Sequence, residues 1–113
     1  MSSPLTTHIL DTARGTPARN VPVRLDALRD GEWVEIGSGR TNDDGRLPGL
    51  LPAGGLTRGV WRMHFDTDAY FRAQGIEGFY PYAEVVFRVT DPGSHHHVPL
   101  LLSPFGFSTY RGS

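Results

Sequence analysis

Glycine and proline are spread along the whole of this chain, and they restrict where it can form a helix. The 113 residues include 14 glycines and nine prolines, and both residue types interrupt helices. The longest stretch that contains neither is residues 60–74. Because every other such stretch is shorter, we expect the chain to fold mainly into short strands joined by turns.

The stretch 60–74 divides into two parts with different patterns. Residues 60–65 largely alternate apolar and polar side chains, as a half-buried strand does. The run Asp-Thr-Asp at 66–68 consists of residues that favour a helix N-cap, and Gly75 is of the type that commonly ends a helix. The pattern therefore predicts a strand followed by one short helix over 69–74, with little helix elsewhere.

Several other segments have the composition of strands, and turn residues separate them. Asp30 and Gly31 give a strong hairpin signal between two of these segments, and residues 42–45 (Asn-Asp-Asp-Gly) form a second turn. Pro99 interrupts the last segment, which predicts that this strand lies at a sheet edge or at a bulge. The predicted strands are residues 5–10, 21–28, 33–36, 82–89 and 98–102.

Short strands with turns roughly every 8–12 residues are typical of a β-sandwich. We therefore predict an all-β fold of two antiparallel sheets with one short helix. The chain has no internal repeat, low-complexity tract or linker, and its length suits one domain. We predict a single domain over residues 1–113.

The composition excludes several classes of function. There is no cysteine, so disulfides, thiolate metal sites and cysteine nucleophiles are absent. The 11 basic residues are all arginine and are balanced by 12 acidic residues, which argues against a nucleic-acid partner and excludes lysine chemistry. No apolar run approaches the roughly 20 residues that span a bilayer, and the N-terminus does not resemble a secretory signal. We expect a soluble, cytoplasmic protein with no membrane partner.

Five histidines are the most informative polar residues. Strand alternation places Thr6 and His8 on one face of the first strand, and a run of three histidines precedes the last one. Within that run, His95 and His97 share a face and His96 points the opposite way. Two interpretations stay open from spacing alone: solvated surface histidines, or metal ligands whose third partner the sequence does not define. The remaining histidine, His64, is expected to be a structural strand residue.

Arg46 and the C-terminus are two further features of interest. Arg46 follows the 42–45 turn, where a solvated arginine at a strand start is the simpler interpretation. The chain ends in Tyr110, Arg111, Gly112 and Ser113. Terminal residues are usually disordered unless other contacts hold them, and the tyrosine and arginine could supply such contacts.

Three segments resemble the transthyretin-like 5-hydroxyisourate hydrolases. They are Leu-Thr-Thr-His-Ile-Leu-Asp at 5–11, Thr-Asn-Asp-Asp-Gly-Arg at 41–46, and His-His-His-Val-Pro-Leu-Leu-Leu-Ser-Pro at 95–104, which leads into the terminal Tyr-Arg-Gly-Ser. The terminal motif is the most specific of these, because it separates the hydrolases from the hormone-carrying transthyretins. The resemblance covers essentially the whole chain. Its departures are mild: His96 stands where the family usually has tyrosine, and Phe105 and Phe107 replace tyrosines.

The resemblance implies a fold, an assembly and a reaction. The fold is a transthyretin-like β-sandwich, and the assembly is a homotetramer with sites where dimers meet. The reaction is hydrolysis of 5-hydroxyisourate, the product of urate oxidation, to 2-oxo-4-hydroxy-4-carboxy-5-ureidoimidazoline on the way to allantoin. The family requires no cofactor, so neither a cofactor nor a metal is expected here.

The resemblance also implies roles for individual residues. His8 and His97 would activate water and relay protons, in an order that is not fixed, and histidine titrates in the range that this work needs. Arg46 would bind the substrate ring and stabilise its developing negative charge. Ser113 would orient a histidine or the water, and Tyr110 would shape the substrate pocket. Arg111 and Gly112 would position the terminus beside the substrate.

Two non-enzymatic alternatives remain. A transthyretin-type carrier of small ligands would keep the fold without catalysis, and a purely structural β-sandwich would bind no small molecule. The terminal motif together with His8, Arg46 and His97 favours the hydrolase over the carrier.

Overall fold

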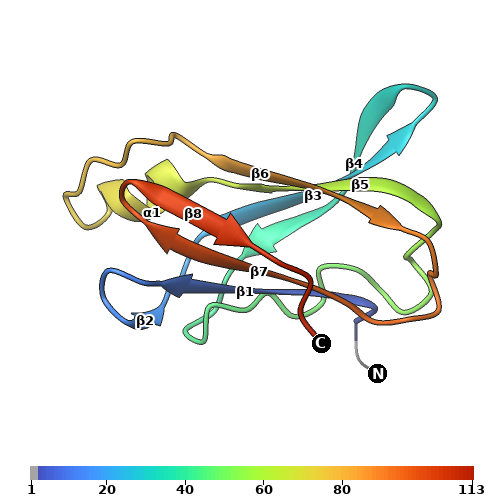
Figure 1. Ribbon diagram of the computed structural model, residues 1–113, viewed down its shortest axis with the longest axis horizontal. Helices are drawn as coiled ribbons and strands as arrows, with labels where there is room; N and C mark the ends of the chain where they lie inside the picture. Colours follow the sequence, from blue (N-terminus) through green and yellow to red (C-terminus); the bar gives the residue numbers. More distant parts are fainter. Residues whose placement is uncertain (1–2) are drawn as a thin grey trace.

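The computed structural model describes residues 3–113 and consists of two four-stranded sheets and one short helix (Figure 1). One sheet has the strand order β2-β1-β7-β8, and the other has the order β4-β3-β5-β6. The elements are β1 (Leu5–Asp11), β2 (Thr16–Pro17), β3 (Pro22–Arg29), β4 (Glu32–Arg40), β5 (Gly59–Phe65), α1 (Thr67–Arg72), β6 (Ala83–Val89), β7 (His96–Ser103) and β8 (Gly106–Thr109).

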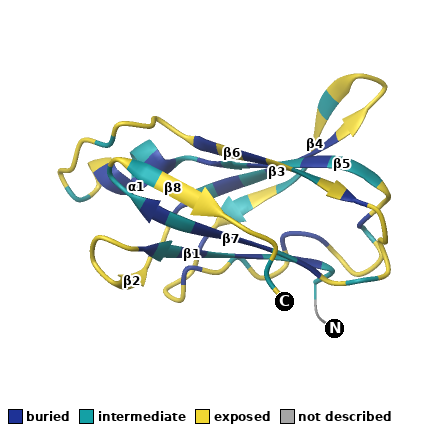
Figure 2. Ribbon diagram, in the orientation of Figure 1, coloured by how far each residue is buried: buried dark blue, intermediate teal, exposed yellow. Residues whose placement is uncertain are grey.

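The two sheets pack face to face around one apolar core. Strand β1 alternates between buried and partly exposed residues throughout, and β5 does so from Val60 onward, so each presents one face to the core (Figure 2). The largest fully buried apolar side chains come from both sheets, from the helix and from the loop between β4 and β5: Leu5 and Ile9 of β1, Leu25 of β3, Leu51 of the loop, Trp61, Met63 and Phe65 of β5, Phe71 of α1 and Leu100 of β7.

The prediction of a strand followed by one short helix within residues 60–74 is confirmed, although the helix begins and ends two residues earlier than predicted, at Thr67 and Arg72. A strand ends at Phe65 and the helix begins at Thr67. The Asp66 side chain is the N-cap and accepts a hydrogen bond from the backbone N–H of Ala69 at 3.1 Å. Gly75 follows the helix with a φ of 69°, a left-handed conformation that glycine adopts without strain. Within residues 3–113, no helix is long and apolar enough to cross a membrane.

The β-sandwich is confirmed, but one strand pair departs from the predicted antiparallel pattern. The β4-β3-β5-β6 sheet is antiparallel throughout. In the other sheet β1 pairs with β7 in parallel, from Leu5 opposite His96 to Asp11 opposite Leu102. The two segments lie at opposite ends of the chain, so no local turn sets their relative direction, and the prediction of two purely antiparallel sheets was wrong for this pair.

Of the two alternatives predicted for the strand with Pro99, a sheet edge or a bulge, the sheet edge is wrong, because β7 lies between β1 and β8. Pro99 is tolerated there because pairing on the β8 side is interrupted next to it. The ladder between β7 and β8 starts at Leu100, and the next contact is an isolated bridge between His97 and Gly112. A missing N–H at Pro99 therefore falls in the gap between the ladder and the bridge.

A buried hydrogen bond connects the helix to β1. The Tyr70 hydroxyl donates to Oδ2 of Asp11 at 2.6 Å, and the Asp11 residue is 1% exposed. Oδ1 of Asp11 accepts the backbone N–H groups of Ala13 and Arg14. These bonds fold the chain into the turn that lets the short strand β2 pair with the end of β1. Neither β2 nor β8 was predicted from the sequence.

Candidate active site

The outer face of the β2-β1-β7-β8 sheet carries three of the predicted functional residues and Thr6. Thr6 and His8 share one face of β1, as predicted, and because the buried positions of β1 are its odd-numbered residues, this face points away from the core. The parallel register places His97 directly opposite Thr6. Residues about ninety positions apart in the sequence are therefore neighbours on one face.

Arg46 reaches the same face through a tight turn. It forms an isolated antiparallel bridge with His8, on the opposite side of β1 from β7. The preceding Gly45 has a φ of 73° and accepts the Ile9 backbone N–H at 2.9 Å. A Cβ at Gly45 would lie 2.5 Å from the Ile9 carbonyl oxygen, so this approach requires glycine. The Asn42 side chain accepts the Arg46 N–H at 3.1 Å and closes the turn.

The C-terminal segment packs against His97. The Gly112 N–H donates to the His97 carbonyl at 2.8 Å. A Cβ at Gly112 would lie only 2.4 Å from Cδ2 of the His97 ring, so the backbone of Gly112 lies against this ring. Arg111 extends toward the segment before β7, where Nη2 contacts the Ser94 hydroxyl and the His95 carbonyl at 3.4 Å each. These contacts position the chain end beside His97.

Tyr110 and Ser113, two further predicted site residues, are exposed to solvent. Tyr110 is 58% exposed, and Ser113 is exposed at the end of the segment. Tyr110 lines a pocket of about 300 Å³ between β6 and the β7-β8 pair, together with His97. Thr6 and Arg46 line a separate pocket of about 270 Å³. One chain therefore brings the predicted residues to one face but does not enclose them in one cavity.

The surroundings of His97 favour its neutral form. Partial burial, followed by the positive charges of Arg46, His95 and His8, lowers the pKa of His97 below its ordinary value. At neutral pH this ring therefore carries no charge and has a lone pair available to accept a proton.

The Thr6 hydroxyl lies between two histidine rings. Its Oγ1 is 2.8 Å from Nδ1 of His97 and 2.9 Å from Nε2 of His95. His95 and His97 share a face as predicted, while His96 points into the core and is 4% exposed. Sequence reasoning noted that Thr6 shares a face with His8 but gave it no role. The alternation of β1 placed Thr6 on the same face as His8, but only the pairing of β1 with β7 shows that Thr6 lies opposite His97.

The metal interpretation of the histidine run has no support in the geometry. Among residues 3–113, no group of three or more histidine, aspartate or glutamate side chains is placed to hold a metal ion.

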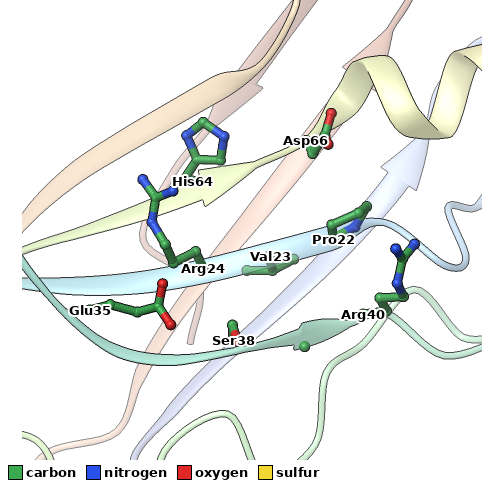
Figure 3. A pocket seen from close by; sticks show the side chains of 9 residues that line it. Pro22, Val23, Arg24, Glu35, Ser38, Arg40, His64 and Asp66 are labelled. Carbon is green, nitrogen blue, oxygen red and sulfur yellow. The ribbon is translucent and has the colours of Figure 1, made fainter.

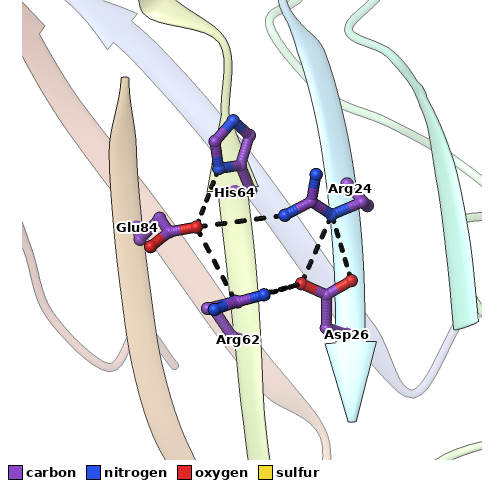
Figure 4. A network of polar contacts seen from close by, with 5 residues as sticks. All are labelled: Arg24, Asp26, Arg62, His64 and Glu84. Atoms are coloured by element: carbon purple, nitrogen blue, oxygen red, sulfur yellow. Dashed lines mark hydrogen bonds and ion pairs between the residues drawn. The ribbon is translucent and has the colours of Figure 1, made fainter. Parts of the chain in front are cut away.

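A second polar cluster lies on the outer face of the opposite sheet. His64 stacks on Tyr82 with ring centroids 4.9 Å apart, and its Nδ1 is 2.9 Å from Oε2 of Glu84. The 2% exposed Asp26 accepts hydrogen bonds from Arg24 and Arg62, so the arginines and carboxylates neutralise each other (Figure 4). This agrees with the structural role expected for His64.

An open pocket of about 410 Å³ lies beside that cluster (Figure 3). Its polar lining again contains both signs of charge: Arg24, Arg40, Glu35 and Asp66, together with His64 and Ser38. None of the predicted site residues lines it.

The chain was compared with known protein families, curated proteins and solved structures. The model of the HIUase/Transthyretin family matches residues 5–112. A 5-hydroxyisourate hydrolase from Mus musculus is 50% identical, with 99% of this chain and 97% of that protein covered. A 5-hydroxyisourate hydrolase from Salmonella typhi is 41% identical, with 99% and 82% covered. A crystal structure of sea bream transthyretin in complex with thyroxine superposes with a TM-score of 0.91 at 38% identity, with 96% of this chain and 94% of that chain covered.

Proposed function

The chain belongs to the HIUase/Transthyretin family, and we propose that it is the hydrolase of that family rather than the carrier. It hydrolyses 5-hydroxyisourate in urate degradation. The observation that carries this conclusion is the outer face of the β2-β1-β7-β8 sheet, where His8, Arg46 and His97 gather and Gly112 packs against the His97 ring. The relatives named as hydrolases at 41–50% identity support the same activity.

The residue types fit the opening of a cyclic amide. A neutral His97 takes a proton from water, and the water oxygen then bonds to a ring carbonyl carbon. Arg46 stabilises the oxyanion that forms on the carbonyl oxygen. The bond between that carbon and the ring nitrogen breaks, and His8 supplies a proton to the departing nitrogen. The product of this ring opening is 2-oxo-4-hydroxy-4-carboxy-5-ureidoimidazoline.

The terminal residues shape the site in this proposal. Tyr110 forms a wall of the pocket that contains His97, and Ser113 orients the water or a histidine. Arg111 and Gly112 hold the chain end in position, which agrees with the contacts of Arg111 to residues 94 and 95. The reaction uses no cofactor in this scheme, and a single domain over residues 1–113 carries it.

We further propose that the active form is a homotetramer with sites between dimers. Arg46 and His97 line separate open pockets in one chain, so a second copy is needed to close the site. Strands β6 and β8 are edge strands of their sheets and line one pocket together, and exposed aromatic residues lie next to them in the sequence. Phe79 is 68% and Phe105 76% exposed, and Tyr80 packs edge-on against both Phe79 and Phe107. Light scattering should give a mass near four chains, and a fully active monomer would contradict the assembly.

The decisive experiment follows the absorbance decay of freshly generated 5-hydroxyisourate above its spontaneous rate. The parent protein should accelerate the decay, and His8→Ala, Arg46→Ala and His97→Ala should each lose at least about a hundredfold of that activity. His64→Ala is the matched control, because His64 lies on the opposite sheet. A parent protein that leaves the decay unchanged would favour the carrier, which the thyroxine complex of a relative makes the second candidate.

A further inference from the structure

The Thr6 hydroxyl lies between the side chains of two histidines, His95 and His97. The side chain is half-buried on β1, opposite His97, and its Oγ1 is within hydrogen-bond distance of Nδ1 of His97 and Nε2 of His95. Both distances are below 3.0 Å, so both are good hydrogen bonds. The rings of His97 on β7 and of His95 just before that strand are thus joined through a single hydroxyl of the neighbouring strand β1.

A hydroxyl has one proton, so Thr6 can donate to only one of the two rings and must accept from the other. In the first arrangement His97 donates from Nδ1 and Thr6 donates to His95, which leaves Nε2 of His97 with a free lone pair. In the second arrangement His95 donates to Thr6 and Thr6 donates to His97, so that Nε2 of His97 carries the proton. The two tautomers of His97 therefore depend on the direction of this hydrogen-bond chain.

We propose that Thr6 is a positioning residue that sets the tautomer of His97 and passes the surplus proton of that ring to His95. The inference rests on the proposed hydrolase function and adds a route by which the proton taken from water leaves His97. When Nε2 of His97 takes a proton from water, the ring becomes an imidazolium. Its Nδ1 proton then moves to the Thr6 oxygen while the Thr6 hydroxyl proton moves to Nε2 of His95. One positive charge has moved from His97 to His95, and no bond to carbon changes.

The surroundings give the chain of hydrogen bonds a direction. Arg46 and His8, together with His95 when that ring is protonated, place positive charge near His97, which disfavours a further charge there. The relay therefore starts with His95 neutral, so that its Nε2 can accept the proton. His95 is exposed, so it can release the proton to solvent. The Arg111 contact with the His95 carbonyl holds the backbone of that segment in place. The proton therefore leaves the more enclosed ring for the more exposed one.

Two substitutions at Thr6 and one control test the proposal. Thr6→Val removes the hydroxyl but keeps the branched shape, and Thr6→Ser keeps the hydroxyl. Thr12→Val is the control, because the Thr12 hydroxyl lies just beyond the end of β1 and bonds to the Leu102 carbonyl of β7 rather than to a histidine ring. We expect Thr6→Val to lower kcat by about tenfold or more, as when a catalytic histidine loses the partner that fixes its tautomer. Thr6→Ser and Thr12→Val should stay near the parent kcat.

Ring nitrogen-15 shifts of His97 give a second readout that does not depend on turnover. The parent and Thr6→Ser should show the tautomer protonated at Nδ1, and Thr6→Val should shift toward the tautomer protonated at Nε2. Unchanged ring shifts in Thr6→Val, or an equal loss of kcat in Thr12→Val, would overturn the proposal. If the ring shifts of His97 change with the Thr6 hydroxyl as expected but the parent does not hydrolyse 5-hydroxyisourate, the proposed function fails. The coupling between Thr6 and His97 then still stands.

Discussion

Replacing Gly112 by alanine tests whether the close packing of the chain end on His97 matters for activity. The added Cβ would lie 2.4 Å from Cδ2, 3.1 Å from Cγ and 3.3 Å from Cβ of His97. Carbon atoms pack at about 3.5–4.0 Å, so the ring or the terminal segment must move by at least about 1 Å. A displacement of that size at a reacting group costs on the order of a hundredfold in rate, or about 2.7 kcal/mol.

The fold should survive this change, because the terminal segment lies outside the core. Circular dichroism and sizing of Gly112→Ala should therefore match the parent, while kcat/KM for 5-hydroxyisourate falls about a hundredfold. Gly106→Ala is the matched control in the same C-terminal hairpin. A Cβ there meets only the Ser103 hydroxyl, at an ordinary 3.7 Å, and kcat/KM should be unchanged. Parent-like kcat/KM in Gly112→Ala, with unaltered His97 resonances, would refute the reasoning.

Four other predictions concern the terminus, electrostatics, metal and stability. Deleting residues 110–113 should leave a folded assembly but remove at least about a hundredfold of the activity; near-normal turnover would contradict this. Arg46→Gln removes a positive charge that lowers the pKa of His97, so an NMR titration should show that pKa rising and the ring protonating at higher pH; a fall would be the wrong sign. Exhaustive chelation should leave the rate intact, and a loss restored by zinc would promote a metal mechanism. Tyr70→Phe leaves Oδ2 of the buried Asp11 without its donor and should cost about 1–3 kcal/mol in chemical denaturation, whereas no measurable change would contradict that role.

Local signals predicted the elements that depend on local contacts. The strand and helix within 60–74 follow from alternation and from the Asp66 cap, and both effects act within a few residues. The hairpin at Asp30 and Gly31 is similar, because both residues adopt the positive φ that such a turn needs. Alternation alone also predicted that His96 points opposite to His95 and His97, and the structure shows that His96 is the buried one of the three.

Contacts between distant segments could not be predicted in this way. The parallel pairing of β1 with β7 joins segments about ninety residues apart, and the two-residue β2 exists only because Asp11 holds the turn before it. From residue spacing alone, His97 could be either a metal ligand or a solvated side chain, and Arg46 was interpreted as a solvated arginine. The family resemblance selected them, and the strand register shows why they meet: Thr6 faces His97, and His8 faces Arg46.

Charge pairing distinguishes the two outer faces, although both carry histidine and arginine side chains. On the β4-β3-β5-β6 face, Arg24 and Arg62 both bind the buried Asp26, and His64 binds Glu84. The ion pairs among residues 3–113 do not include Arg46. An arginine already neutralised by a carboxylate has little attraction left for an oxyanion, whereas one without such a partner can stabilise the charge that develops on a substrate oxygen. The positive charge of Arg46, unpaired with a carboxylate and close to His97, therefore fits the hydrolytic site that we propose for the β2-β1-β7-β8 face better than the paired charges of the opposite face would.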